Sequence, residues 1–164
     1  MIRHLFLSVI AFFIITNSVY SQDFEVGKVT LSDLNFDRNI IDSNANAVVL
    51  RENGKSFIVV DDYSNQPTLT HQYQVIIKVF NKEGFSKANF SLPLYKRNIQ
   101  SEDRVLNIQA TTYNLENGKL VRTEFDKSKI YRENYSENIK LQKFTLPNIK
   151  EGSVIEVNYT VNYC

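Results

Sequence analysis

Apolar and polar residues alternate along much of this chain, with the period of two that is typical of β-strands with one buried face. The clearest case is 154–163 (VIEVNYTVNY), where every second residue from Ile155 is apolar and the residues between them, Glu156 included, are polar. Residues 104–113 repeat the pattern. In 71–80 the second face is only half polar. These segments predict strands with one apolar and one solvated face, the second face of 71–80 being partly covered.

Glycines and asparagines between these runs predict the turns. Asn53-Gly54 and Asn117-Gly118 each stand in the sequence Glu-Asn-Gly-Lys between two β-rich runs. Asn-Gly favours the type I′ turn of a tight hairpin, because both residues tolerate a positive φ. We expect a hairpin at each pair, a longer hairpin loop at Asn81–Gly84, and a turn at Gly152 before the last strand.

Helical periodicity is scarce, and 33–47 is the best candidate for a turn or two of helix. We place Pro67, Pro93 and Pro147 at strand ends or in loops, where a missing N–H does no harm. About eight or nine strands with frequent turns predict an all-β fold, an antiparallel β-sandwich, formed by a single domain over 22–164.

The first 21 residues have the features of a signal peptide. A positive start precedes an apolar run of 11 residues over 5–15, which is too short to cross a bilayer as a helix. Val19 and Ser21 fit the −3 and −1 positions of a cleavage site, so we predict a cut before Gln22. The mature protein would then be exported to the periplasm or outside the cell, with no membrane span.

Charge gives no sign of a nucleic-acid partner. The chain has 19 Lys and Arg against 18 Asp and Glu, and removing the leader with Arg3 leaves 18 of each. A neutral chain lacks the basic surface that nucleic acids need. Residues 22–70 nevertheless carry a balance of −4 and residues 119–150 one of +4. These segments could cancel each other, leave one basic face, or be solvated beside neighbours of opposite sign.

Few residues could hold a metal ion. Once the leader with His4 is removed, His71 has no second His and only carboxylates as possible co-ligands, so we interpret it as a surface or strand-edge residue. The segment Asp61-Asp62-Tyr63-Ser64-Asn65 offers oxygens suited to Ca²⁺. Asp, Ser and Asn are also the residues that turns prefer, and this is the interpretation we favour.

Catalytic residues are equally scarce. Two carboxylates facing one cleft could cleave a glycoside, but none of the acids has a partner that the sequence places opposite it. The candidates are Glu102-Asp103, Glu151 and Glu156, which we interpret as solvated. Cys164 is the last residue, and no His lies within its strand. We therefore assign no catalytic, cofactor-binding or metal-binding residue.

Tyrosines gather among the basic residues of the last third. Exposed tyrosines on a sheet can contact a sugar or a peptide, whereas buried ones pack between strands. Packing is the interpretation we favour, because Tyr is common in strands and the chain has no Trp. The residues concerned are Tyr113, Tyr131, Tyr135, Tyr159 and Tyr163.

Three stretches together resemble a known family. They are Asn44–Leu50 with the Glu-Asn-Gly-Lys that follows it, Asn107–Lys119, and Lys143–Tyr159 (KFTLPNIKEGSVIEVNY). Over about residues 26–163 the chain is similar to the domain of unknown function 3857, the N-terminal module of exported transglutaminase-like proteins of Bacteroidetes-type bacteria. The resemblance implies a β-sandwich that is not itself known to be catalytic, followed by a transglutaminase-like domain with a Cys, His and Asp.

Together these observations predict a non-catalytic accessory module of an exported transglutaminase-like protein. Its partner would be the downstream domain or another protein, and no cofactor is expected. The alternative is a stand-alone exported module that binds a glycan or a peptide through its Tyr- and Lys-rich last third.

Overall fold

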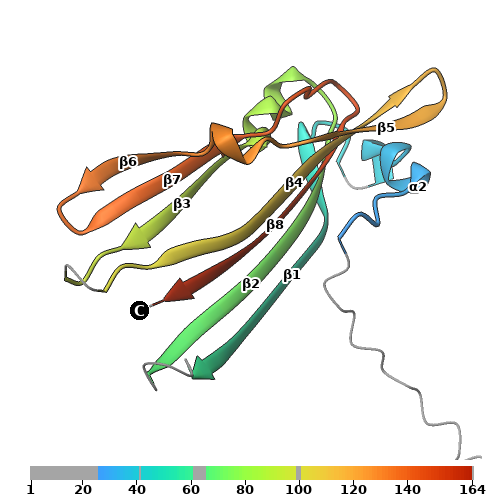
Figure 1. The fold of residues 1–164 in the computed structure, drawn as a ribbon. Helices are drawn as coiled ribbons and strands as arrows, with labels where there is room; N and C mark the ends of the chain where they lie inside the picture. Colours follow the sequence, from blue (N-terminus) through green and yellow to red (C-terminus); the bar gives the residue numbers. More distant parts are fainter. Residues whose placement is uncertain (1–25, 41, 61–65, 99–100, 164) are drawn as a thin grey trace, which may run out of the picture.

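Eight antiparallel strands form two packed sheets, as the period of two predicts (Figure 1). The computed structural model describes residues 26–40, 42–60, 66–98 and 101–163. A five-stranded sheet has the order β1-β2-β8-β4-β5, and a three-stranded sheet has the order β3-β7-β6. The strands are β1 (Ala47–Val60), β2 (Pro67–Val79), β3 (Asn89–Tyr95), β4 (Arg104–Glu116), β5 (Lys119–Glu124), β6 (Tyr131–Ser136), β7 (Ile139–Thr145) and β8 (Val154–Tyr163). The helical turns are α2 (Leu31–Leu34), η1 (Arg38–Ile40), η2 (Lys82–Ala88) and η3 (Lys127–Lys129).

The core lies between the two sheets. Ile155 and Val157 of β8 are fully buried there, which confirms that the apolar face of this strand points inward. From the other sheet comes Phe144 of β7, whose ring centroid lies 5.2 Å from those of both Phe90 and Phe125. This aromatic cluster joins β3 and β7 of the smaller sheet to Phe125, which directly follows β5 of the larger sheet.

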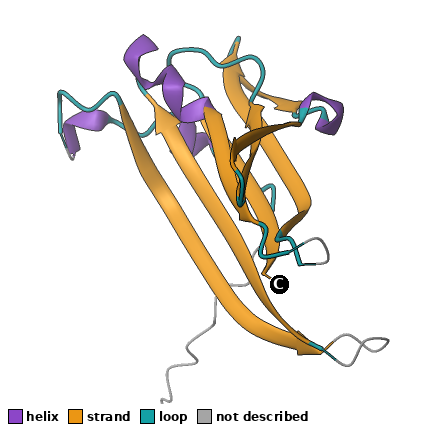
Figure 2. Cartoon of the chain, turned by 90° about the vertical axis from the view of Figure 1, so that its left-hand side faces the viewer, coloured by secondary structure: helices purple, strands orange, loops and turns teal. Residues whose placement is uncertain are grey.

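The outer face of the five-stranded sheet is also covered at one end. Ile76 and Lys78 of β2 are 2% and 3% exposed, which confirms the expected cover on that strand's second face. The cover is the segment 26–40, whose Val29 and Leu34 form a small apolar cluster with Ile76. Figure 2 shows the long β1 and β2 running well past the other strands at the opposite end.

Only one of the two Asn-Gly pairs forms a hairpin. Asn117 and Gly118 have φ of 52° and 75° and join β4 to β5, as predicted. The prediction for Asn53-Gly54 is wrong: both residues lie inside the continuous strand β1, where Gly54 pairs with Tyr73 of β2. The physical reason is that β2 is long enough to pair with both flanking runs at once. The preference of Asn-Gly for a turn is outweighed by an uninterrupted ladder.

This difference predicts unequal effects of alanine at the two glycines. We expect Gly118→Ala to lower the free energy of unfolding by about 1–2 kcal/mol, because L-residues disfavour the left-handed region. Gly54→Ala should change the free energy of unfolding by less than about 0.5 kcal/mol. The added methyl group would lie 3.2 Å from the His71 ring, which is slightly unfavourable, but alanine also reduces the conformational entropy of the unfolded chain, which is favourable. Urea denaturation measures both, and equal losses would contradict the extended conformation of Gly54.

Two further expectations need correction. Asn81–Gly84 does not form a hairpin loop, because Asn81 caps η2, and this helical turn carries the chain from β2 to β3 in the other sheet. Pro93 lies in the middle of β3, opposite Leu141, rather than at a strand end. The strand tolerates it because β3 is an edge, where a missing N–H breaks no ladder bond. Pro67 and Pro147 lie at a strand start and after a strand, as predicted.

The turn or two of helix expected within 33–47 is present as two separate turns, α2 and η1. The first begins slightly earlier, at Leu31, and β1 already begins at Ala47. Thr30 and Asp33 form a capping box at α2. The predicted signal peptide and cleavage site lie outside the described residues.

Candidate functional site

A buried carboxylate lies at the centre of the outer face of the five-stranded sheet. Glu156 of β8 is 1% exposed, which overturns its interpretation as a solvated acid on a wet face. Its Oε1 and Oε2 accept the backbone N–H of Gly27 at 3.1 and 3.0 Å. Tyr113 Oη donates to Oε2 at 2.8 Å, and Gln74 Nε2 donates to Oε1 at 3.1 Å. Three strands and the N-terminal segment therefore meet at one side chain.

Two more charged groups hold the same segment in place. Lys78 Nζ donates to the carbonyl oxygens of Leu34, at 2.5 Å, and Gly152, at 2.6 Å, and burial lowers the pKa of this lysine. Arg51 forms a two-point contact with Asp33 at 2.8 and 2.9 Å. Burial acts to raise the pKa of Asp33, but the hydrogen bonds from Arg51 and Thr30 outweigh it and lower the pKa. We name Glu156, Lys78 and the Arg51–Asp33 pair the polar anchor.

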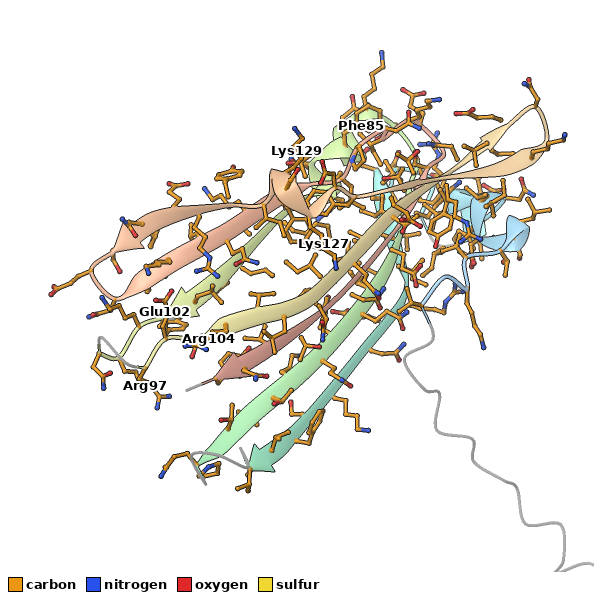
Figure 3. The ribbon with its side chains drawn as sticks, viewed as in Figure 1. Phe85, Arg97, Glu102, Arg104, Lys127 and Lys129 are labelled. Atoms are coloured by element: carbon orange, nitrogen blue, oxygen red, sulfur yellow. The ribbon has the colours of Figure 1, made fainter. Side chains whose placement is uncertain are left out.

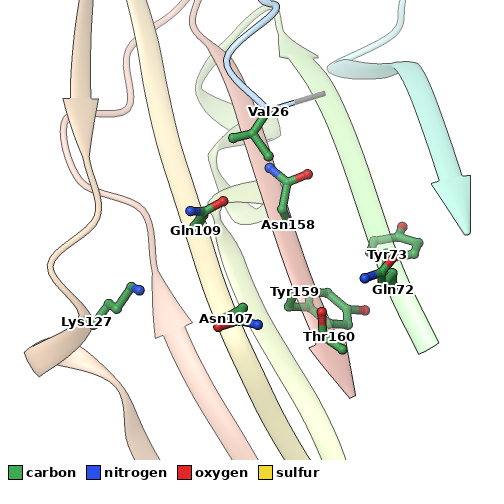
Figure 4. Close-up of a pocket in the computed structure, with 9 residues that line it drawn as sticks. All are labelled: Val26, Gln72, Tyr73, Asn107, Gln109, Lys127, Asn158, Tyr159 and Thr160. Carbon is green, nitrogen blue, oxygen red and sulfur yellow. The ribbon is translucent and has the colours of Figure 1, made fainter. Parts of the chain in front are cut away.

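Next to the polar anchor lies a pocket of about 320 Å³, lined almost entirely by neutral polar residues (Figure 4). Asn158, on the same face of β8 as Glu156, is 8% exposed, and neither its Nδ2 nor its Oδ1 has a hydrogen-bond partner. The only charged group among the described lining residues is Lys127. The lining residues are Val26, Gln72, Tyr73, Asn107, Gln109, Lys127, Asn158, Tyr159 and Thr160.

Of the metal-ligand candidates, the structure describes only His71. His71 lies on β2, and its Nδ1 is 2.8 Å from the Ser56 hydroxyl, which fits a strand residue near the surface. Among the residues that the structure describes, no three His, Cys, Asp or Glu side chains form a group that could hold a metal ion. The candidate calcium segment Asp61–Asn65 and Cys164 lie outside the described residues.

The other acidic candidates have separate surroundings. Glu102, two residues before β4 (Figure 3), forms an ion pair with Lys140 at 2.9 Å. The hydrogen bond from this lysine, more than its charge, lowers the pKa of Glu102. Asp103 accepts the backbone N–H of Tyr95 at 3.0 Å. Glu151 is exposed in the turn before β8. The structure does not bring these acids together into one cleft.

The tyrosines of the last third divide into two groups. Tyr113 is 2% exposed, and the ring of Tyr159 lies 5.1 Å from that of Tyr73, beside the core. Tyr131 and Tyr135 are 57% and 69% exposed on β6, an edge strand of the three-stranded sheet. Tyr163, the last described residue, is partly buried on β8. Packing, the interpretation that we favoured, holds for some of these tyrosines, and β6 presents the others to solvent.

Among the described residues, the ion pairs lie within each half of the chain rather than between the two charged segments. Lysines of the basic segment pair with acids of the second half of the chain, and one of these acids, Glu133, belongs to the basic segment itself. These pairs are Lys140–Glu102, Lys143–Glu133 and Lys150–Glu116. The acidic segment supplies its own pair, Arg51–Asp33. These contacts fit the possibility that the charges of each segment lie beside neighbours of opposite sign.

Comparison with known proteins adds little. No family model and no curated protein matches the sequence. Among solved structures, the chain is similar to one described as a putative protease from Parabacteroides distasonis ATCC 8503, with 10% identity and a TM-score of 0.47. The match covers 59% of this chain and 20% of that one, so this chain corresponds to about a fifth of that protein's length. Similarity at this level carries no argument about activity. No helix in the described ranges is long and apolar enough to span a membrane.

The polar anchor is the feature that sequence reasoning missed. Its signal lies in β2, where Gln74 and Lys78 flank Ile76 on one face. Ile76 must be covered because it is apolar, and whatever covers it also buries the polar residues on either side of it. The acid that faces them, Glu156, is part of a regular alternation and gives no such signal.

Proposed function

We propose that this chain is an exported, non-catalytic accessory module of a transglutaminase-like protein, as its resemblance to the domain of unknown function 3857 implies. Its role is to dock against the domain that follows it. The observation that carries the docking role is an exposed apolar surface at the far ends of β1 and β2.

This surface, which we call the apolar tip, consists of Ile58, Val60 and Leu69, which share one face of the β1–β2 pair. Their exposed fractions are 69%, 53% and 45%. Adjacent β-branched and leucine side chains at such exposure, on strands that project past the rest of the sheet (Figure 2), are typical of a surface that another protein covers.

The position of the apolar tip suits a domain attached after Cys164. Leu69 of β2 pairs directly with Tyr163 at the end of β8. Figure 1 shows β8 ending beside β2, with β1 and β2 continuing past it. A following domain would begin next to exposed apolar side chains, and burying them would favour a fixed arrangement of the two domains.

The contacts of the acids support a module without catalysis. Glu102 is held by Lys140, and Glu156 accepts hydrogen bonds from three donors that hold the fold together. Both carboxylates therefore have structural partners, as expected of a supporting domain.

The test begins with the gene. We expect the reading frame to continue past the codon for Cys164 into a domain with Cys, His and Asp. The purified 22–164 fragment should show no amidase or transamidase activity. A stop codon after Cys164, or activity that a point substitution in the fragment abolishes, would overturn the proposal.

Matched leucine variants test the apolar tip. We expect Leu69→Ser to weaken binding of the separately expressed downstream domain about tenfold, because roughly 1–2 kcal/mol of apolar burial is lost. Leu115, also 45% exposed, lies beside the β4–β5 hairpin and serves as the control. Titration calorimetry measures both, and equal weakening by Leu115→Ser would show that the apolar tip is not the contact.

A second candidate function, binding of a glycan or peptide, is favoured by the exposed rings of Tyr131 and Tyr135. Arg132 does not belong with them, because its Nε donates to Gln142, which is buried. Under this function, Tyr131→Ala with Tyr135→Ala should abolish ligand binding and keep the free energy of unfolding within about 1 kcal/mol. Glycan arrays and urea denaturation measure the two effects, and unfolding of the double variant would show that the rings pack instead.

A further inference from the structure

We infer that the pocket beside Asn158 is a binding site for an extended peptide, recognised through its backbone amide groups. This inference is independent of the proposed function, because the pocket lies on the outer face of the sheet and the apolar tip at its far end. It rests on the unpaired side-chain amide of Asn158 and on the polar residues that line the pocket around it.

The side-chain amide of Asn158 is buried without partners. Its Nδ2 and Oδ1 have almost no solvent contact and no hydrogen bond, although a buried amide normally forms several. Leaving both groups unpaired disfavours the fold. The neighbouring Glu156, one step along the same face of β8, has all its partners. An unpaired amide next to a fully satisfied carboxylate is expected where the missing partner is a ligand.

The lining of the pocket indicates the class of ligand. Gln72, Gln109 and Thr160 offer neutral donors and acceptors, and only Lys127 is charged, so an anionic ligand would find one cation. A sugar usually stacks on an aromatic ring, but the rings of Tyr73 and Tyr159 lie against each other and the core. A neutral ligand that both donates and accepts hydrogen bonds fits this lining best.

An extended peptide has the required geometry. In an extended residue the N–H and C=O point to the same side, so that one asparagine amide can accept from the first and donate to the second. The β-bulge of β4 between Leu106 and Gln109 interrupts pairing with β8 beside the pocket. Asn107 in this bulge has φ of 52°, a left-handed conformation that asparagine tolerates.

One exposed side chain has to move for a peptide to enter. Val26 lies beside the Asn158 amide (Figure 4) and is 48% exposed. It precedes Gly27, whose N–H is fixed by Glu156. We expect rotation of the Val26 side chain to open a path to the amide while the contact between Gly27 and Glu156 stays in place.

The test uses N-acetyl-Ala-Ala-Ala-amide and the ¹⁵N spectrum of the mature chain. We expect saturable shifts of the Asn158 side-chain NH₂ signals with a millimolar dissociation constant. The matched ester analogue, which lacks the central N–H, should bind at least about tenfold more weakly. Asn158→Leu should lose binding and melt at the same or a higher temperature, because it removes the unpaired groups.

Three results would overturn the inference. They are the absence of saturable shifts in the wild type, equal binding by Asn158→Leu, and shifts caused by methyl β-glucoside but not by the peptide. If Asn158→Leu does not fold, Val26→Trp is the second variant. It alters an exposed position and fills the pocket, so it should remove binding and keep the melting temperature, and retained binding would place the peptide elsewhere.

Discussion

Glu156→Ala is expected to lower the free energy of unfolding by about 3–5 kcal/mol, a large effect for a substitution on a face that the sequence presents as solvated. The variant leaves three donors without an acceptor: the Gly27 N–H, the Tyr113 hydroxyl and the Gln74 amide. Each unpaired buried group costs about 1–3 kcal/mol, partly recovered where water enters. Urea denaturation measures the loss, and hydrogen exchange at Gly27 should become fast.

Glu151→Ala is the matched control. Glu151 lies five residues earlier and is exposed, so its replacement should stay within about 0.5 kcal/mol of the wild type. The loss of unfolding free energy in Glu156→Gln should lie between those of the two alanine variants. The amide keeps one accepting oxygen but turns an NH₂ group toward a donor. Equal stabilities of the two alanine variants would show that Glu156 does not hold the N-terminal segment.

At alkaline pH the domain should lose stability through Tyr113. Burial, and then the hydrogen bond to Glu156, raise the pKa of this tyrosine above its ordinary value of 10.0. Above about pH 10 the unfolded chain ionises the tyrosine while the folded chain keeps the proton, so folding becomes less favourable as the pH rises. The expected slope from this group is about 1.4 kcal/mol per pH unit for as long as the folded chain keeps the proton.

Tyr113→Phe should flatten this alkaline decline, although it lowers stability at neutral pH by removing a hydrogen bond to a buried carboxylate. Lys78 acts in the opposite direction below its ordinary pKa of 10.5, because burial lowers its pKa in the folded state. The wild type and Tyr113→Phe both contain Lys78, so its contribution cancels when their free energies of unfolding are subtracted. Tyr135→Phe, at a 69% exposed position, is the control. Parallel alkaline slopes of the wild type and Tyr113→Phe would contradict the assignment.

The sequence predicts the strands well and their pairing only in part. The period of two locates β2, β4 and β8, because alternation follows directly from the geometry of a strand with one buried face. It does not reveal which segments pair. The same four letters, Glu-Asn-Gly-Lys, form a hairpin at Asn117-Gly118 and a continuous strand at Asn53-Gly54. A distant partner, β2, decides between the two outcomes.

The candidate site was harder to predict, because burial of polar residues depends on what covers them. Glu156 and Asn158 alternate with apolar residues as solvated side chains would. They are buried because a segment about 130 residues earlier crosses over them, with Gly27 and Glu156 separated by 129 positions. Local pattern contains no information on such a contact. The half-polar face of 71–80 gave the only warning that this side of the sheet is covered.

The position of β8 determines the order in which the domain can assemble. This strand is last in the chain, yet it lies in the middle of the five-stranded sheet, between β2 and β4. Until it arrives, these two strands cannot join, both present unpaired edges, and the N-terminal segment has no Glu156 to hold it. The segment 26–40 is thus among the last parts of the domain to be fixed. Because contacts so distant in sequence form slowly, this domain should fold only after β8 is available, and two open strand edges stay exposed until then.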